Sequence, residues 1–211
     1  MALTRSKDSK TAKASNASKT FALLADNLAR AEKIIAKYPA GRQASAVIPL
    51  LEIAQRQNGG WLSQAAMNFV AKKLDMPPVR VYEVATFYSM FNLKPVGKNF
   101  VQICTTTPCW LRGSEDIVHA CQKKLGINLD ETTKDGKFTL REVECLGACV
   151  NAPVVQINDD FYEDLTPDAM DKILDTLKAG KKPEAGSQTG RSGSCPQDGS
   201  TSLKKKADTD A

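Results

Sequence analysis

The chain has 211 residues, of which 42% are apolar and 25% charged, with a formal net charge of +5. This composition is ordinary for a globular protein with one good core, or one domain plus an extension. No apolar run approaches the roughly 18 to 20 residues that span a bilayer, and the N-terminus lacks the apolar stretch of a secretory signal. The sequence therefore predicts neither direct membrane insertion nor secretion.

The positive charge is concentrated in the two tails. Residues 1–20 carry five basic and one acidic side chain, residues 178–211 carry seven and four, and the stretch between them has 17 basic against 19 acidic. This distribution predicts solvated basic arms, or arms that lie on an acidic partner, and argues against nucleic acid as a partner. We expect residues 1–20 to be a disordered arm, with a cleaved mitochondrial transit peptide as the alternative.

Residues 21–93 are predicted to form a helical bundle. Apolar side chains recur at helical spacing in four stretches, which are separated by helix-breaking residues at Pro39–Gly41, Gly59–Gly60 and Pro77–Pro78. Ser45 and Ser63 are the predicted N-caps of the second and third helices, because a serine hydroxyl can accept a hydrogen bond from a free backbone N–H at a helix start.

The pattern changes after Lys94–Gly97, which we interpret as a domain boundary. Alternating apolar residues predict strands at 99–104, 138–145 and 153–157, with a further short strand at 161–162. Helical spacing predicts helices at 111–125 and 167–177, the second of them capped by Thr166.

The order β-α-β-β-α over residues 98–178 resembles a thioredoxin-like α/β sandwich. The chain as a whole is therefore predicted to be α+β, with a helical bundle followed by this sandwich. Residues 179–211 are rich in Gly, Ser, Lys and Thr and almost free of large apolar side chains. They are predicted to be a disordered tail.

Four cysteines form two close pairs that are far apart in the sequence, Cys104 with Cys109 in CTTTPC and Cys145 with Cys149 in CLGAC. The first cysteine of each pair is the last residue of a predicted strand. Without a secretory signal, thiols are expected to serve metal binding or catalysis rather than disulfides. Two such pairs predict a metal site with four thiolate ligands.

The spacings discriminate between three kinds of site. Zinc knuckles usually have two residues between the cysteines, whereas the gaps here are four and three. A thioredoxin-type dithiol needs C-x-x-C, which is absent. The first pair has the C-x4-C spacing of part of the plant-type ferredoxin run. Spacing therefore favours an iron–sulfur cluster, and a zinc-stabilised structural adaptor is the alternative from another functional class.

The remaining candidate residues are interpreted as structural. Cys121 lies on the apolar face of the helix predicted at 111–125, so it is predicted to be a core residue. His119 on the same helix is predicted to lie at the surface. Trp110 either shields the metal site from water or simply packs. Cys195 falls in the predicted tail and is expected to be a free thiol.

The segments CTTTPC, CLGACVNAP and GWLSQAAMNFVAKKLDMPPVRVYEVATFYSMF together resemble one family. It is the small thioredoxin-like [2Fe–2S] subunit of the NADH-oxidising module of respiratory complex I, the translocase NADH:quinone oxidoreductase. The resemblance extends from Phe21 to Gly180. It implies one [2Fe–2S] cluster, whose iron ligands are the cysteines of both motifs, Cys104, Cys109, Cys145 and Cys149.

The resemblance also implies the mechanism and the partners. In this family the cluster accepts single electrons from the flavin of a partner subunit, which carries both FMN and NADH. This chain has no G-x-G-x-x-G after a predicted strand and no Walker motif, so we expect no NADH or flavin site on the chain itself. Equivalent subunits of NAD-linked hydrogenases and formate dehydrogenases are the alternative within electron transfer.

The implied partners are the flavin- and NADH-binding subunit and other peripheral-arm subunits of complex I. The implied location is the cytoplasmic side of a bacterial inner membrane as a peripheral subunit, or the matrix side of the mitochondrial inner membrane. We expect exposed apolar residues of the helical part, among them Trp61 and Phe91, to help form the interface with the partner.

Overall fold

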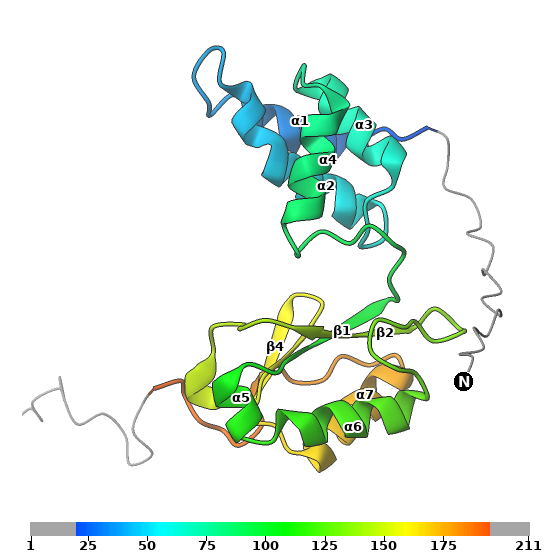
Figure 1. Cartoon of the computed structure of the whole chain (residues 1–211), viewed down its shortest axis with the longest axis vertical. Coiled ribbons are helices and arrows are strands. Elements are labelled where there is room, and N and C mark those ends of the chain that lie inside the picture. The colour runs from blue at the N-terminus through cyan, green and yellow to red at the C-terminus, as the bar shows by residue number, and fades with distance from the viewer. Residues whose placement is uncertain (1–19, 195–211) are drawn as a thin grey trace, which may run out of the picture. The chain divides into compact units, whose positions relative to one another are not determined.

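The computed structural model describes residues 20–194 and divides into two compact units between Pro95 and Val96 (Figure 1). The predicted arm up to Lys19, the predicted tail from Cys195 and the thiol of Cys195 lie outside the described residues. Between Thr20 and Ser194, no helix combines the length and the apolar content that crossing a bilayer requires.

The first unit consists of helices around one apolar core. They are α1 (Ala25–Ile35), the 3-10 turn η1 (Gln43–Ala46), α2 (Val47–Gln57), α3 (Gln64–Lys73) and α4 (Pro78–Phe87). Leu50, Leu51, Val70 and Val81 are completely buried in this core. The helices are amphipathic, so burying their apolar faces together removes a large hydrophobic surface from water.

One of the two predicted caps in this unit is confirmed. The Ser63 hydroxyl accepts a hydrogen bond from the backbone N–H of Ala66 over 3.2 Å at the start of α3. The prediction that Ser45 caps α2 is wrong, because Ser45 lies inside η1 and α2 follows directly after that turn.

The prediction of an exposed Phe91 is also wrong. Its side chain is 5% exposed and packs in the core of the first unit, because the chain turns back on itself after α4. Trp61 is half-buried. The large exposed apolar side chains near this point include Phe87, which is 80% exposed, and Met90, which is 50% exposed, together with Tyr88 and Leu93.

The second unit is a mixed five-stranded sheet with helices. Its elements are β1 (Asn99–Cys104), α5 (Thr107–Leu111), α6 (Ser114–Leu125), β2 (Phe138–Val143), the 3-10 turn η2 (Cys149–Asn151), β3 (Val155–Ile157), β4 (Asp160–Glu163), α7 (Pro167–Lys178) and β5 (Gly186–Ser187). The strand order is β2-β1-β3-β4-β5. Strands β1 and β2 are parallel, and β3 is antiparallel to both of its neighbours.

Helices α6 and α7 lie side by side on one face of this sheet (Figure 1). Val101 and Leu140 of the sheet pack with Ile117 of α6 and with Leu174 of α7, and all four are at most 1% exposed. The predicted cap of α7 is confirmed, since the Thr166 hydroxyl accepts a hydrogen bond from the Ala169 N–H over 3.2 Å. Helices and a mixed sheet together make the chain α+β.

The helix predicted at 111–125 begins at Ser114 as α6, and a short helix that was not predicted, α5, precedes it. Gly113 separates α5 from α6 with a φ of +90°, a backbone conformation that favours glycine. Because α5 begins at Thr107, Cys109 lies on a helix rather than in the loop that the sequence pattern suggested.

The disorder predicted from residue 179 onward is wrong for residues 179–194. Strand β5 pairs in parallel with β4, and the Arg191 guanidinium lies 3.1 Å from the Asp164 carboxylate. Composition misses this segment because backbone hydrogen bonds and an ion pair dock it, without large apolar side chains.

Candidate metal centre

Cys104 and Cys109 form a buried pair. Cys104 is the last residue of β1, and its backbone N–H donates to the Val154 carbonyl over 3.2 Å. Cys109 lies in the middle of the short helix α5, which follows β1. Both side chains are 1% exposed and pack with Ala152 and Val154 in a small cluster of their own. The strand and the helix therefore hold these two thiols rigidly.

Hydrogen bonds distinguish the two thiols of this pair. Burial acts to raise the pKa of Cys104, but the Thr106 hydroxyl, 3.2 Å from the sulfur, and the backbone N–H groups of Leu146 and Thr106 bring that pKa below its ordinary value. Burial and the hydrogen bond to Cys104 raise the pKa of Cys109 to about 12. Cys104 is thus the first of the two to become a thiolate, the form that binds metal.

Cys145 and Cys149 form an exposed pair, Cys145 in the loop after β2 and Cys149 as the first residue of η2. Their sulfur atoms are 3.6 Å apart, and the Gly147 N–H donates to the Cys145 sulfur over 3.4 Å. Gly147 has a φ of +82°, which turns its N–H back toward that sulfur at little cost for a glycine. The hydrogen bond with Cys145 raises the pKa of Cys149.

The loop that carries the second pair lies against the first pair. Leu146 and Ala148, which lie between Cys145 and Cys149, pack against the small buried cluster that holds Cys104 and Cys109. Within residues 20–194, no three Cys, His, Asp or Glu side chains already converge closely enough to hold a metal ion. In this part of the chain, the two cysteines of each motif thus lie together, and the loop of the second motif packs beside the first motif. The four thiols do not yet converge on one metal position.

The donor set around these sulfurs fits a negatively charged cluster. The Thr106 hydroxyl, between β1 and α5, lies 3.2 Å from the Cys104 sulfur, and the Gly147 N–H of the second loop donates to the Cys145 sulfur. A [2Fe–2S] centre with four thiolate ligands carries negative charge, and hydrogen bonds to its sulfurs are a main means by which proteins stabilise it.

Two of the other candidate residues lie as predicted. Cys121 is completely buried on α6, where burial and then the charge of Asp171 raise its pKa to about 12, and His119 is exposed. Trp110 is 53% exposed, and its indole N–H donates to Glu115 over 3.0 Å.

Sequence reasoning missed Asn151, which lies two residues after Cys149 and is 1% exposed. Its side-chain amide donates to Glu163 over 2.8 Å. The signal that could have found it is a polar residue placed between a candidate ligand and an apolar strand, because such a residue needs buried partners.

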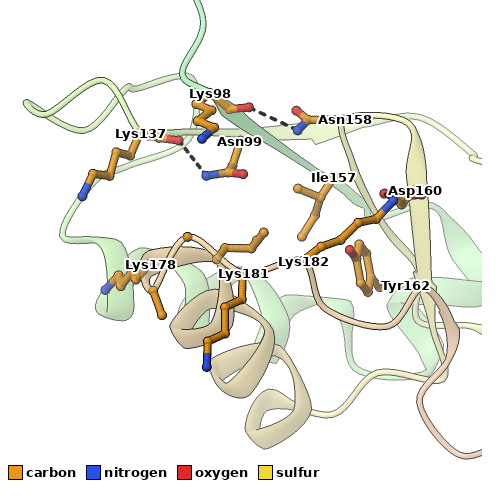
Figure 2. Close-up of a pocket in the computed structure, with 13 residues that line it drawn as sticks. Lys98, Asn99, Lys137, Ile157, Asn158, Asp160, Tyr162, Lys178, Lys181 and Lys182 are labelled. Atoms are coloured by element: carbon orange, nitrogen blue, oxygen red, sulfur yellow. Dashed lines mark hydrogen bonds and ion pairs between the residues drawn. The ribbon is translucent and has the colours of Figure 1, made fainter.

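A basic cavity of about 520 Å³ lies at the end of β1 away from Cys104 (Figure 2). Five lysines are among the residues that line it, Lys98, Lys137, Lys178, Lys181 and Lys182. Among the described residues, Asp160 is the one carboxylate of the lining, and it is paired with Lys182 at 2.9 Å. Lysines attract anions as point charges, and no cysteine of residues 20–194 lines the cavity. It is therefore separate from the candidate metal centre.

Comparison with known proteins gives consistent matches. The family model described as thioredoxin-like [2Fe–2S] ferredoxin matches residues 31–178. The chain is 66% identical over 152 residues to the E subunit of NADH-quinone oxidoreductase from Rickettsia bellii, covering 72% of this chain and 91% of that protein. It is 55% identical over 183 residues to NADH dehydrogenase [ubiquinone] flavoprotein 2, mitochondrial, of Dictyostelium discoideum, covering 87% of this chain and 74% of that protein.

Among solved structures, an NAD⁺-reducing [NiFe]-hydrogenase in its H₂-reduced state matches with a TM-score of 0.55. The identity is 20%, and the match covers 62% of this chain and 23% of that chain. This likeness shows the shared fold alone.

Proposed function

Because the chain belongs to the thioredoxin-like [2Fe–2S] ferredoxin family, we propose that it is the small electron-transfer subunit of NADH:quinone oxidoreductase. The observation that carries this proposal is the pair of cysteine motifs, one buried and one on an adjoining loop, surrounded by hydrogen-bond donors. The relatives named above support it, since both carry names of subunits of this oxidoreductase. The chain is thus part of an enzyme whose dehydrogenase chemistry belongs to the assembly.

Cys104, Cys109, Cys145 and Cys149 are the proposed ligands of one [2Fe–2S] cluster. When bound there, the cluster supplies one-electron redox chemistry. The buried pair provides a rigid half of the site on β1 and α5, and the exposed loop supplies the second half. The Thr106 hydroxyl and the loop N–H groups stabilise the negative charge of the thiolates.

We propose that the two units have different roles. Residues 98–178 form the cluster domain, and the helical bundle at residues 21–93 clamps a partner subunit that carries FMN and NADH. The exposed apolar side chains of Phe87 and Met90 support the docking role of the bundle. The assembled subunit is peripheral to the membrane, on the cytoplasmic face in a bacterium or the matrix face in a mitochondrion.

The equivalent subunit of an NAD-linked hydrogenase or formate dehydrogenase is less well supported. The matched hydrogenase is 20% identical to this chain, whereas the NADH-quinone oxidoreductase relative is 66% identical. A zinc-stabilised adaptor needs the same cysteines but no redox-active metal.

Low-temperature EPR of the dithionite-reduced, anaerobically purified chain, with iron and zinc measured on the same sample, tests the proposal. We expect an S = 1/2 signal and about two irons per chain, as a [2Fe–2S] centre requires. Cys104→Ala removes the proposed ligand and should lose the signal, and Cys121→Ala is the matched control that should keep it, because Cys121 is a core residue on α6. About one zinc and no iron would favour the structural adaptor instead.

Isolation of the tagged chain from its native membranes tests the partner. The purified fraction should contain flavin and should oxidise NADH. Hydrogen or formate oxidation in the same fraction would contradict the assignment to NADH:quinone oxidoreductase.

A further inference from the structure

The segment of residues 184–194, here called the C-terminal strap, docks on the outer edge of the sheet. Its strand β5 pairs with β4, with Tyr162 opposite Gly186 and Glu163 opposite Ser187. The Gln188 N–H then donates to the Glu163 carbonyl over 3.0 Å. The strap therefore satisfies backbone groups of β4 that an uncovered edge strand would leave unpaired.

The strap also supplies partners for a buried carboxylate. The Asp164 side chain is 5% exposed, and the Arg191 guanidinium lies 3.1 Å from one of its oxygens. The Ser187 hydroxyl donates to the other oxygen over 2.6 Å and accepts a hydrogen bond from the Arg191 N–H over 3.0 Å. A buried carboxylate is costly without such partners, so the strap and Asp164 hold each other in place.

Asp164 in turn holds the turn that follows Cys149. The Asp164 N–H donates to the Asn151 carbonyl over 2.7 Å, and the Asn151 side-chain amide donates to Glu163 over 2.8 Å. Asn151 is the last residue of η2, which begins at Cys149. Its own N–H donates to the Ala148 carbonyl over 3.0 Å, which closes the cysteine loop. A continuous chain of hydrogen bonds thus runs from the strap to the residues on both sides of Cys149.

We propose that the C-terminal strap positions the Cys145–Cys149 loop, with Arg191 as the positioning residue at its far end. The loop needs support from outside because both of its thiols are exposed, whereas Cys104 and Cys109 are held by buried packing. Arg191 acts through Asp164 and Asn151 and touches neither thiol. That the positioned thiols ligate a [2Fe–2S] cluster rests on the proposed function above, whereas the positioning itself does not.

The test compares Arg191→Ala with the wild-type full chain in its metal-free form. Hydrogen–deuterium exchange should show faster deuterium uptake across residues 148–152, and mass spectrometry should show faster alkylation of Cys149, with unchanged uptake in α6. Lys124→Ala is the matched control, because it removes the ion pair of Lys124 with Asp175 at 2.8 Å in the same unit without touching the strap. Arg191→Lys keeps the charge beside Asp164 and should restore most of the protection.

The loaded protein provides a second readout. Loss of iron to a chelator should be about tenfold faster in Arg191→Ala, the lower end of the effect typical when support of a metal ligand is removed. The reduction potential should also shift relative to wild type and to Lys124→Ala.

Equal deuterium uptake and equal Cys149 alkylation in Arg191→Ala and wild type would overturn the proposal. If Arg191→Ala does not fold, Ser187→Ala serves in its place, because it removes one donor to Asp164 and leaves the ion pair. A wild-type chain that binds no iron would refute the proposed function, while the metal-free measurements would still decide the role of the strap.

Discussion

Replacing Gly97 by alanine should destabilise the second unit strongly. A Cβ at this position would lie 2.7 Å from the carbonyl carbon, 2.8 Å from the nitrogen and 2.9 Å from the Cα of Phe138. These are backbone atoms at the start of β2, so no side-chain rotation can relieve the overlap. The Gly97 N–H also donates to the Thr139 hydroxyl over 2.6 Å, and this contact would be disturbed together with the strand.

The expected loss follows from these distances. Overpacking typically costs about 1–3 kcal/mol, and an obstacle made of backbone places the cost near the upper end. Weakening the hydrogen bond to Thr139 adds about 1 kcal/mol, so we expect a loss of about 3–4 kcal/mol in the free energy of unfolding. At about 4 °C or more per kcal/mol for a domain of this size, the melting temperature of the second unit should fall by at least about 12 °C.

Differential scanning calorimetry of the metal-free full chain measures this change, and Gly126→Ala is the control. Gly126 has a φ of +67°, and apart from its two chain neighbours no described residue comes within 4 Å of the place a Cβ would take. Alanine there suffers only from the left-handed backbone, at about 1–2 kcal/mol. If Gly97→Ala melts no lower than Gly126→Ala, the predicted overlap between a Cβ at residue 97 and the Phe138 backbone does not destabilise the second unit, and the reasoning is refuted. Because β1 leads from this point to Cys104, Gly97→Ala should also lower the yield of metal-loaded protein.

Three further outcomes are expected. Thr106→Val removes the hydroxyl 3.2 Å from the Cys104 sulfur, so the reduction potential in an EPR-monitored titration should fall by about 40 mV, equivalent to about 1 kcal/mol for one electron; an unchanged potential would show that the hydroxyl does not stabilise the reduced site. Burial raises the pKa of Cys121 to about 12 in the folded chain, whereas an unfolded thiol titrates at about 8.5. The stability that this protonated thiol contributes to the folded chain is therefore complete below about pH 8.5. Above that value the free energy of unfolding should fall by about 1.4 kcal/mol per pH unit. Urea unfolding of Cys121→Ala should lack this slope, and equal slopes in the two proteins would contradict the assignment. Ser63→Ala removes the cap on the Ala66 N–H and should cost the first unit about 1 kcal/mol in urea unfolding, so an unchanged midpoint would mean that α3 does not depend on this cap.

The features predicted correctly from the sequence depend on interactions within a few residues. Ser63 and Thr166 cap their helices as predicted, because a cap and the N–H it serves are three residues apart. Cys121 is buried as predicted, because the apolar face of a helix follows from its period. The spacing within each cysteine pair is likewise local, so the sequence alone indicated two thiol pairs and the class of metal they suit.

The tertiary structure decided everything that depends on contacts between distant residues. Cys104 and Cys109 are a buried pair and Cys145 and Cys149 an exposed one, although the two motifs look alike in sequence. Arg191 pairs with Asp164, which lies 27 positions earlier in the chain, and Phe91 turns inward after α4. Periodicity and capping describe how a segment folds on itself, whereas burial, ion pairing and the support of a loop depend on which other segment packs against it.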